Sequence, residues 1–201
     1  MNYQNSRDAA WQMLIKNHIS SLPVSVNNIC KSEHIRLFTY QEGKRVIEQL
    51  SLQDHMHEND AFSFCHMIFF DDRQPITRQR FSVAHELGHI VLHPAVEATV
   101  LNREISPNDS PLETEANIFA SRLLAPLCIL HFLNLNSPQQ IAELCQISMI
   151  AAKIRYQRLC DIRKRDERMR SKKGYGCFLL SPLEQQVYRN FENYIKSNEI
   201  N

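Results

Sequence analysis

Glycine is scarce in this sequence, with only 4 glycines among 201 residues. Folds built mainly from β-strands need many tight turns, and glycine is the residue that most readily occupies them. The scarcity therefore disfavours an all-β fold. A domain dominated by helices fits this composition better.

Long apolar stretches are absent as well. No run approaches the roughly 18 apolar residues of a membrane span. The first residues, MNYQNSRDAAWQMLIKNH, lack the basic cluster and apolar stretch of a signal peptide. We therefore expect a cytoplasmic protein that makes no contact with a membrane.

The chain has no strong excess of either charge. Its formal net charge is +1, 22% of its residues are charged and 43% are hydrophobic. This balance argues against a disordered tail protein and against a generally basic nucleic-acid binder. None of the six cysteines forms a C-x-x-C pair, and most lie in apolar runs. We expect buried free thiols, without disulfides or a cysteine-based zinc site.

The spacing of apolar residues predicts mainly helices. Helices are expected within residues 6–20, 25–30, 42–52, 77–94 and 112–126, as two helices within 137–159 that break near Ile147-Ser148, and from Pro182 onward. Strands are expected at 34–40 and, as one or two strands, at 61–70. Loops are expected at 53–60 and 95–110, and a strand or loop at 174–181.

The chain is expected to fall into two parts that pack as one domain. Residues 1–130 would form the part that carries the chemistry. Residues 131–201 would form a helical C-terminal part, with a helix-turn-helix-like segment at 137–160, a basic segment and a terminal helix.

The chemistry is expected on the helix that contains His85-Glu86-Leu87-Gly88-His89. Histidines four residues apart lie on one face of a helix, where both imidazoles can bind one Zn²⁺ ion. Glu86 can reach a water bound to that ion and take its proton as a general base, and the water then attacks a peptide carbonyl. The motif therefore predicts a metallo-endopeptidase with an α+β, mostly helical, zincin-like fold. A small β-sheet should lie beside this H-E-x-x-H helix.

A catalytic zinc ion needs a third protein ligand. The next predicted helix offers two carboxylates, of which Glu113 is preferred and Glu115 is the alternative. His93 continues the four-residue spacing, but eight residues of helix span about 12 Å, so His93 cannot share an ion with His85. A closed structural zinc site would need a fourth protein ligand, and the sequence offers none at suitable spacing.

Two stretches resemble the ImmA/IrrE family of zinc metallopeptidases: RQRFSVAHELGHIVLHP and ETEANIFASRLLAP. The resemblance is close over residues 78–94 and 113–126. It implies that Glu113, the first Glu of E-x-E-A-N, is the third ligand, and that Asn117 supports a metal-binding histidine. Two departures, Ser82 where Thr is commoner and Ala125-Pro126 where Met-Pro is usual, do not touch the ligands.

The resemblance also implies a substrate. Members of this family are implied to cut helix-turn-helix repressors of the Xre type, which releases the repressed genes. The chain would then be an anti-repressor. Because it lacks the length for an additional C-terminal sensor domain, it resembles the short members that belong to mobile genetic elements.

An alternative is a DNA-binding or repressor-binding regulator that uses residues 137–173. Within 153–173 there are ten lysines and arginines against three acidic residues. This basic segment has three interpretations: a solvated helix face, a docking surface for an acidic patch on the repressor, or a surface for direct DNA contact. Salt-dependent DNA binding would distinguish the last interpretation from the others.

Overall fold

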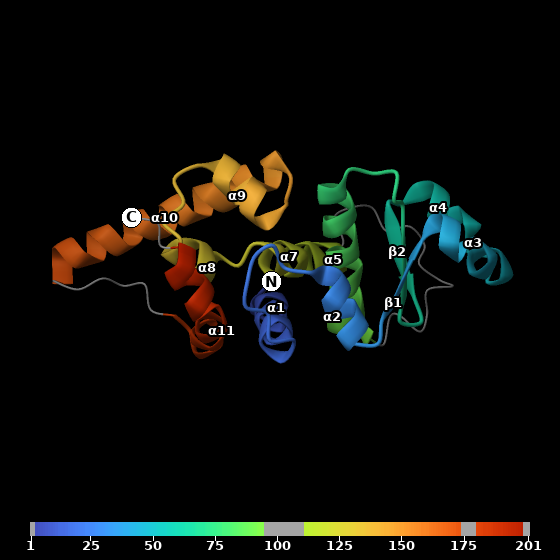
Figure 1. Ribbon diagram of the computed structural model, residues 1–201, viewed down its shortest axis with the longest axis horizontal. Helices are drawn as coiled ribbons and strands as arrows, with labels where there is room; N and C mark the ends of the chain where they lie inside the picture. Colours follow the sequence, from blue (N-terminus) through green and yellow to red (C-terminus); the bar gives the residue numbers. More distant parts are fainter. Residues whose placement is uncertain (1–2, 95–110, 174–179, 199–201) are drawn as a thin grey trace.

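The computed structural model describes residues 3–94, 111–173 and 180–198. A small three-stranded sheet lies among helices, so the expected α+β, mostly helical fold is confirmed (Figure 1). The strands are β1 (Arg36–Thr39), β2 (Ala61–Phe64) and β3 (Met67–Phe70). The helices described are α1 (Gln4–Lys16), α2 (Val26–Ser32), α3 (Tyr40–Gln49), α4 (Gln53–Glu58), α5 (Ile76–Leu92), α7 (Pro111–Leu124), α8 (Leu127–Phe132), α9 (Pro138–Cys145), α10 (Met149–Lys173) and α11 (Pro182–Asn198).

The sheet has the strand order β1-β3-β2, with β1 parallel and β2 antiparallel to β3. The expected 61–70 strand region is therefore a hairpin, in which Phe64 pairs with Met67. Cys65 and His66 form its two-residue turn, and both have positive φ, at 47° and 58°. Such turns usually contain Asn or Gly, so this one carries no sequence signal.

The two faces of the sheet pack against different layers. On one face, Phe62 and Phe69 join a cluster with side chains of α3 and the segment that follows it. On the other face, Ile68 joins the larger core, which contains residues of α1, α5, α7 and α11. Successive side chains of a strand point to opposite faces of the sheet, so one face packs on α3 and the other faces the core that contains the H-E-x-x-H helix, α5. The sequence predicted that the sheet lies beside this helix.

Helix α5 lies between the sheet and α7 (Figure 1). Gly88 makes the close approach of α5 to α7 possible: a Cβ atom there would lie 3.2 Å from Ala116 Cα and 3.1 Å from Phe119 Cδ1. A glycine opposite an alanine lets two helix backbones come this near. This contact brings the start of α7 to the histidines of α5.

The C-terminal helices share the larger core with α1, α5 and α7. Arg80 of α5 connects distant segments, because its guanidinium donates to the carbonyls of Val24, Cys145 and Gln146 at 2.9 to 3.2 Å. It thereby caps the C-terminal end of α9. The break between α9 and α10 falls at 146–148, as expected. The division into 1–130 and 131–201 stays a prediction.

Some expectations were wrong or incomplete. Residues 53–60 were expected to be a loop, but they contain α4, because Met56 packs on the aromatic cluster and the His55 ring lies 5.6 Å from that of Phe62. Helix α8 was not expected: Pro126 ends α7 but also starts α8, whose first residues are buried. Cys65 is exposed at the hairpin turn, against the expectation of buried thiols, whereas Cys30, Cys128 and Cys145 are buried. The expectations for 95–110 and 174–179 lie outside the described residues.

Candidate metal centre

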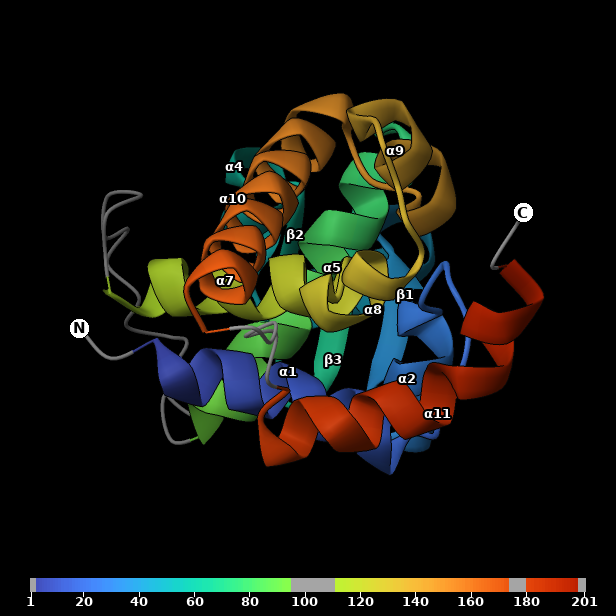
Figure 2. The ribbon, with the colours of Figure 1, turned by 90° about the vertical axis from the view of Figure 1, so that its left-hand side faces the viewer.

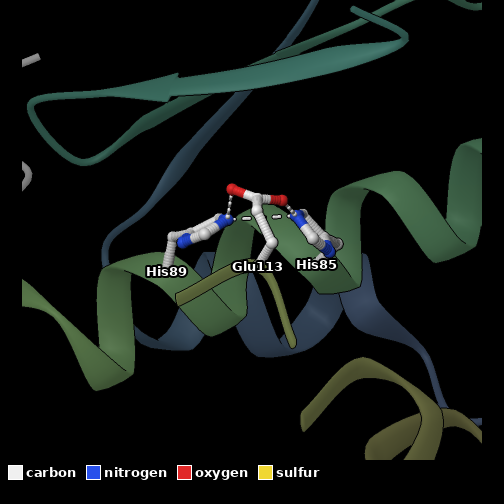
Figure 3. Close-up of side chains that lie close together, drawn as sticks. All are labelled: His85, His89 and Glu113. Carbon is white, nitrogen blue, oxygen red and sulfur yellow. Dashed lines mark hydrogen bonds and ion pairs between the residues drawn. The ribbon is translucent and has the colours of Figure 1, made fainter. Parts of the chain in front are cut away.

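His85 and His89 lie one turn apart on the face of α5 that is turned toward the start of α7 (Figure 3). Their Nε2 atoms are 3.0 Å apart and their rings are nearly perpendicular, at 77°. The His89 side chain is only 2% exposed and that of His85 is 15% exposed. Two imidazole nitrogens thus face one point in a largely buried place.

Glu113, in the first turn of α7, completes the group. One carboxylate oxygen lies 3.1 Å from Nε2 of His85, and the other lies 3.1 Å from Nε2 of His89 (Figure 3). The ligand atoms of these three residues all lie within 4.8 Å of one another, a group that could hold a metal ion. Two imidazoles and one carboxylate are a donor set that zinc takes in catalytic sites, with a further position left open.

Asn117 lies one turn after Glu113 and contacts the other side of the His85 ring. Its Oδ1 lies 3.0 Å from Nδ1 of His85. An amide oxygen only accepts hydrogen bonds, so Nδ1 of His85 carries the proton. In the neutral imidazole, the lone pair is then on Nε2 and faces Glu113 and His89. Nε2 of His85 and the Glu113 carboxylate then face each other at 3.1 Å, an arrangement that a metal cation or a proton held between them stabilises.

The Glu86 side chain reaches from α5 to strand β2 of the sheet. It is 7% exposed, and its Oε2 accepts a hydrogen bond of 2.9 Å from the Ser63 hydroxyl of β2. Ser63 was not among the expected site residues. Because side chains alternate along a strand, the sequence could place Ser63 on the face opposite to Phe62 and Phe64. The contact with Glu86, however, depends on how β2 lies over α5.

Glu115 does not join the group. It lies 3.2 Å from Nε2 of His93, the residue that ends α5. His93 is thus paired with a neighbour at the helix end, and its distance from His85 along the helix keeps it out of the group. Of the two carboxylates that the sequence offered, the structure brings Glu113 to the histidines.

The short distances between His85, His89 and Glu113 shift the pKa values of the group. Burial by itself would lower the pKa of His85, but the hydrogen bond to Glu113 and the charges of Glu86 and Glu113 raise it above its ordinary value. Hydrogen bonds from His85 and His89 hold the pKa of the Glu113 carboxyl well below its usual range. The lowered pKa of Glu113 keeps a charged carboxylate beside the two imidazoles, and the raised pKa of His85 means that a bound metal ion would displace a proton from that ring.

The arginines that precede the motif fix α5 in place. Arg78 pairs with Asp60, just before β2, and Arg80 binds the carbonyls at the end of α9. Both contacts join segments that are distant in the sequence. Neither arginine contacts the three-residue group, so their role here is to position α5.

No helix in the described ranges is both long enough and apolar enough to cross a membrane. The model of the Peptidase_M78 family, described as the IrrE N-terminal-like domain, matches residues 39–157, more than half of the chain. The matched stretch includes β2, β3, α5 and α7, and therefore the whole three-residue group. No curated protein matches the chain.

Proposed function

The chain belongs to the Peptidase_M78 family of IrrE N-terminal-like domains, a family of metallopeptidases, and from this premise we propose that it is a zinc-dependent endopeptidase. One observation carries the proposal. The ligand atoms of His85, His89 and Glu113 converge within 4.8 Å, and the buried carboxylate of Glu86 follows directly on the same helix.

His85, His89 and Glu113 would hold the ion. A zinc ion at such a site polarises a carbonyl and makes water a stronger nucleophile at neutral pH. Asn117 would keep His85 in the tautomer whose Nε2 has a free lone pair. Glu115, paired with His93, is not needed in this arrangement.

Glu86 would be the general base. Its carboxylate takes a proton from the attacking water, while the water oxygen bonds to the carbon of the scissile carbonyl. The same carboxyl group then gives the proton to the leaving nitrogen as the C–N bond breaks. The Ser63 hydroxyl, bonded to Oε2, holds the carboxylate in one orientation during both transfers.

The sheet would position the substrate. β2 is at an edge of the sheet, next to α5, and its other side pairs with no strand in the part of the chain that the structure describes. An extended peptide can add to such an edge by main-chain hydrogen bonds. Figure 3 shows the strands passing over the three side chains, so a peptide added there would lie near the group.

The proposed substrate is a helix-turn-helix repressor of the Xre type, which makes the protein an anti-repressor of a mobile genetic element. This part rests on the family resemblance, and such a substrate would place the protein in the cytoplasm. A DNA-binding role for residues 137–173 is the second candidate. Against it, Arg155 and Arg163 of the basic segment donate to the carbonyls of Ala125 and Leu135 within the protein.

The test is the metal content and cleavage activity of the purified protein and three variants. The unaltered protein should hold about one zinc per chain and cut the repressor encoded beside its gene. Glu86→Gln should keep zinc and lose cleavage, whereas His85→Ala should lose both. His18→Asn is the control, because His18 is exposed with a positive φ that Asn tolerates. Zinc loss in the control, or cleavage by Glu86→Gln at more than a small fraction of the unaltered protein's rate, would contradict the proposal.

A further inference from the structure

A groove of about 1050 Å³ runs beside the three-residue group. Its walls come from the start of α5, from α7 and from α10, and we call it the α7–α10 groove. Figure 2 shows α10 in front of α7 and α5. Phe81 and Asn117 line the groove at the end near His85, since the Phe81 ring lies 6.3 Å from that of His85 and Asn117 contacts His85 directly.

One part of the groove is apolar and open to solvent. Ile150 and Ile154, one turn apart on α10, are 75% and 59% exposed. Isolated exposed apolar residues are ordinary, but here two large ones share a helix face and a concave surface. Together with Phe81 on the facing wall, they offer apolar contacts to a bound chain.

Another part of the groove is basic. Arg158 and Arg165 continue the lining along α10, and Arg122 and Arg155 lie deeper in it, with Asp161 the only acidic residue among the described residues of the lining. No carboxylate of the described chain forms an ion pair with any of these four arginines. The groove therefore has an excess of positive charge, which Asp161 and, at Arg122, the charge of Glu184 offset only in part.

Arg122 and Arg155, the two deeper arginines, have little to compensate their burial. Arg155 is 6% exposed and donates from Nε to the carbonyl of Ala125 at 3.0 Å. The Nε atom of Arg122 is buried and has no hydrogen-bond partner within the described residues. Burial first, and then the charges of Arg7 and Arg158, lower the pKa of Arg122. Burying cations without counter-ions costs free energy, which an anionic partner would offset.

We propose that the α7–α10 groove binds an acidic amphipathic segment of the protein substrate, and so selects the substrate at a distance from the bond that is cut. The apolar side chains of that segment would contact Ile150 and Ile154, and its carboxylates would pair with Arg158, Arg165 and Arg122. The inference rests on the proposed peptidase function, because the groove leads to the group that would hold the metal.

The lining favours a peptide over a nucleic acid. Single-stranded nucleic acids are held by aromatic side chains that stack on bases, and among the described residues of the lining only Phe81 is aromatic. Phosphates gain nothing from the exposed isoleucines Ile150 and Ile154. A peptide with both apolar and acidic residues matches both parts of the groove.

The test is binding of two labelled synthetic peptides, followed by fluorescence anisotropy. The first is an amphipathic peptide of Leu, Ala and Glu, and the second has every Glu replaced by Gln. The protein carries Glu86→Gln, so that neither peptide is cut. The Glu peptide should bind about tenfold more tightly than the Gln peptide at low salt, with the difference shrinking as salt rises.

The variant pair Arg158→Glu/Arg165→Glu should weaken binding of the Glu peptide by about tenfold. The matched control is Lys153→Glu/Lys164→Glu, which makes the same change of charge on exposed residues of α10 outside the groove. The control should bind the Glu peptide nearly as the parent does. Ile154→Ser, at an exposed position, should weaken both peptides alike.

Equal weakening in the groove pair and the control pair would overturn the proposal, because it would show a general charge effect. Binding of a labelled DNA duplex that depends on Arg158 and Arg165, without binding of the Glu peptide, would overturn it in favour of DNA. These measurements need neither zinc nor cleavage. A protein without zinc or activity that still binds the Glu peptide through the groove would therefore overturn only the peptidase proposal.

Discussion

Gly88 of α5 lies against Ala116 of α7, so closely that a Cβ atom on residue 88 would be 3.2 Å from Ala116 Cα and 3.3 Å from its carbonyl oxygen. The third neighbour is the ring of Phe119, which is fully buried and cannot move aside freely. This contact sets the distance between the helix that carries His85 and His89 and the helix that carries Glu113.

Gly88→Ala should therefore destabilise the protein and loosen the metal site together. Ala is favoured over Gly in a helix by about 1 kcal/mol, but overpacking against backbone costs about 1–3 kcal/mol. We expect a net loss of about 1 kcal/mol in the free energy of unfolding, with weaker zinc binding. Urea unfolding and chelator competition measure the two effects. Ser82→Ala, on the same helix, is the control, and unchanged zinc affinity in Gly88→Ala would contradict the assigned role of the contact.

The two glutamates at the start of α7 make a matched pair. Glu113 lies 3.1 Å from each of the two histidine Nε2 atoms, whereas Glu115 lies 3.2 Å from His93. Glu113→Gln should reduce the zinc content from about one per chain to near zero, because a neutral amide is a poor zinc ligand. Glu115→Gln should keep its zinc. The zinc content of each variant after gel filtration measures this. Zinc loss in Glu115→Gln alone would show that Glu115 is the ligand.

Asn117 should matter for metal affinity more than for folding. It is exposed, and its Oδ1 accepts a hydrogen bond from Nδ1 of His85. Asn117→Ala should weaken zinc binding by about tenfold to a hundredfold, the usual effect of losing a partner of a metal-bound histidine. Asn117→Asp, which keeps the acceptor, should retain the affinity. If both variants bound zinc as tightly as the parent, the contact would have no role in metal binding.

The sequence predicted the chemistry of the site better than its surroundings. The positions of His85 and His89 follow from local spacing on one helix, whereas the spacing left Glu113 and Glu115 open as the third residue, and the family resemblance favoured Glu113. The contact between Ser63 and Glu86 joins residues 23 positions apart in the chain. It depends on the register of the sheet over α5, and no local pattern specifies that register.

The same reasoning explains the errors in the fold. The hairpin turn at Cys65 and His66 has positive φ without glycine or asparagine, so the sequence contained no turn signal there. Helix α4 forms in a polar segment because Met56 reaches the aromatic cluster, which is tertiary packing and not helix propensity. The α7–α10 groove likewise arises from helices distant in sequence, so the sequence could show its arginines but not their arrangement.

Asp71 predicts a pH dependence of stability outside the metal group. Its carboxylate accepts hydrogen bonds from the Arg73 side chain and backbone and from Gln74, in the turn between β3 and α5. The Arg73 guanidinium holds the pKa of Asp71 below its ordinary value. A depressed carboxyl pKa adds stability above the unfolded pKa of about 4, and this stability is lost as the pH falls through the folded value.

Asp71→Asn should therefore lower stability at pH 7 and make less difference as the pH falls well below 4. The effect should be small, because Arg73 is exposed to solvent. Urea midpoints across this pH range, with the exposed neighbour Asp72 changed to Asn as control, measure it. An Asp71→Asn loss that stayed constant down to the lowest pH would show that charge has no part in it.

Ser63 offers the sharpest test of how Glu86 works. Its hydroxyl donates to Glu86 Oε2 at 2.9 Å and contacts none of the three proposed ligands within hydrogen-bond distance among the described residues. Ser63→Ala should lower kcat about tenfold, from the loss of one hydrogen bond to a charged group. KM and zinc content should stay nearly unchanged, and Ser63→Thr, which keeps a hydroxyl, should recover part of the rate.

A double-mutant cycle separates positioning of Glu86 from a general effect on the fold. If Ser63 acts through Glu86, then Ser63→Ala should cause no further loss of rate in a protein that already carries Glu86→Gln. A structural defect would instead lower the residual rate by the same factor in both backgrounds. Equal factors would therefore remove Ser63 from the proposed mechanism, whereas a loss confined to the protein with Glu86 intact would tie the β2 hydroxyl to the proton transfers of that carboxylate.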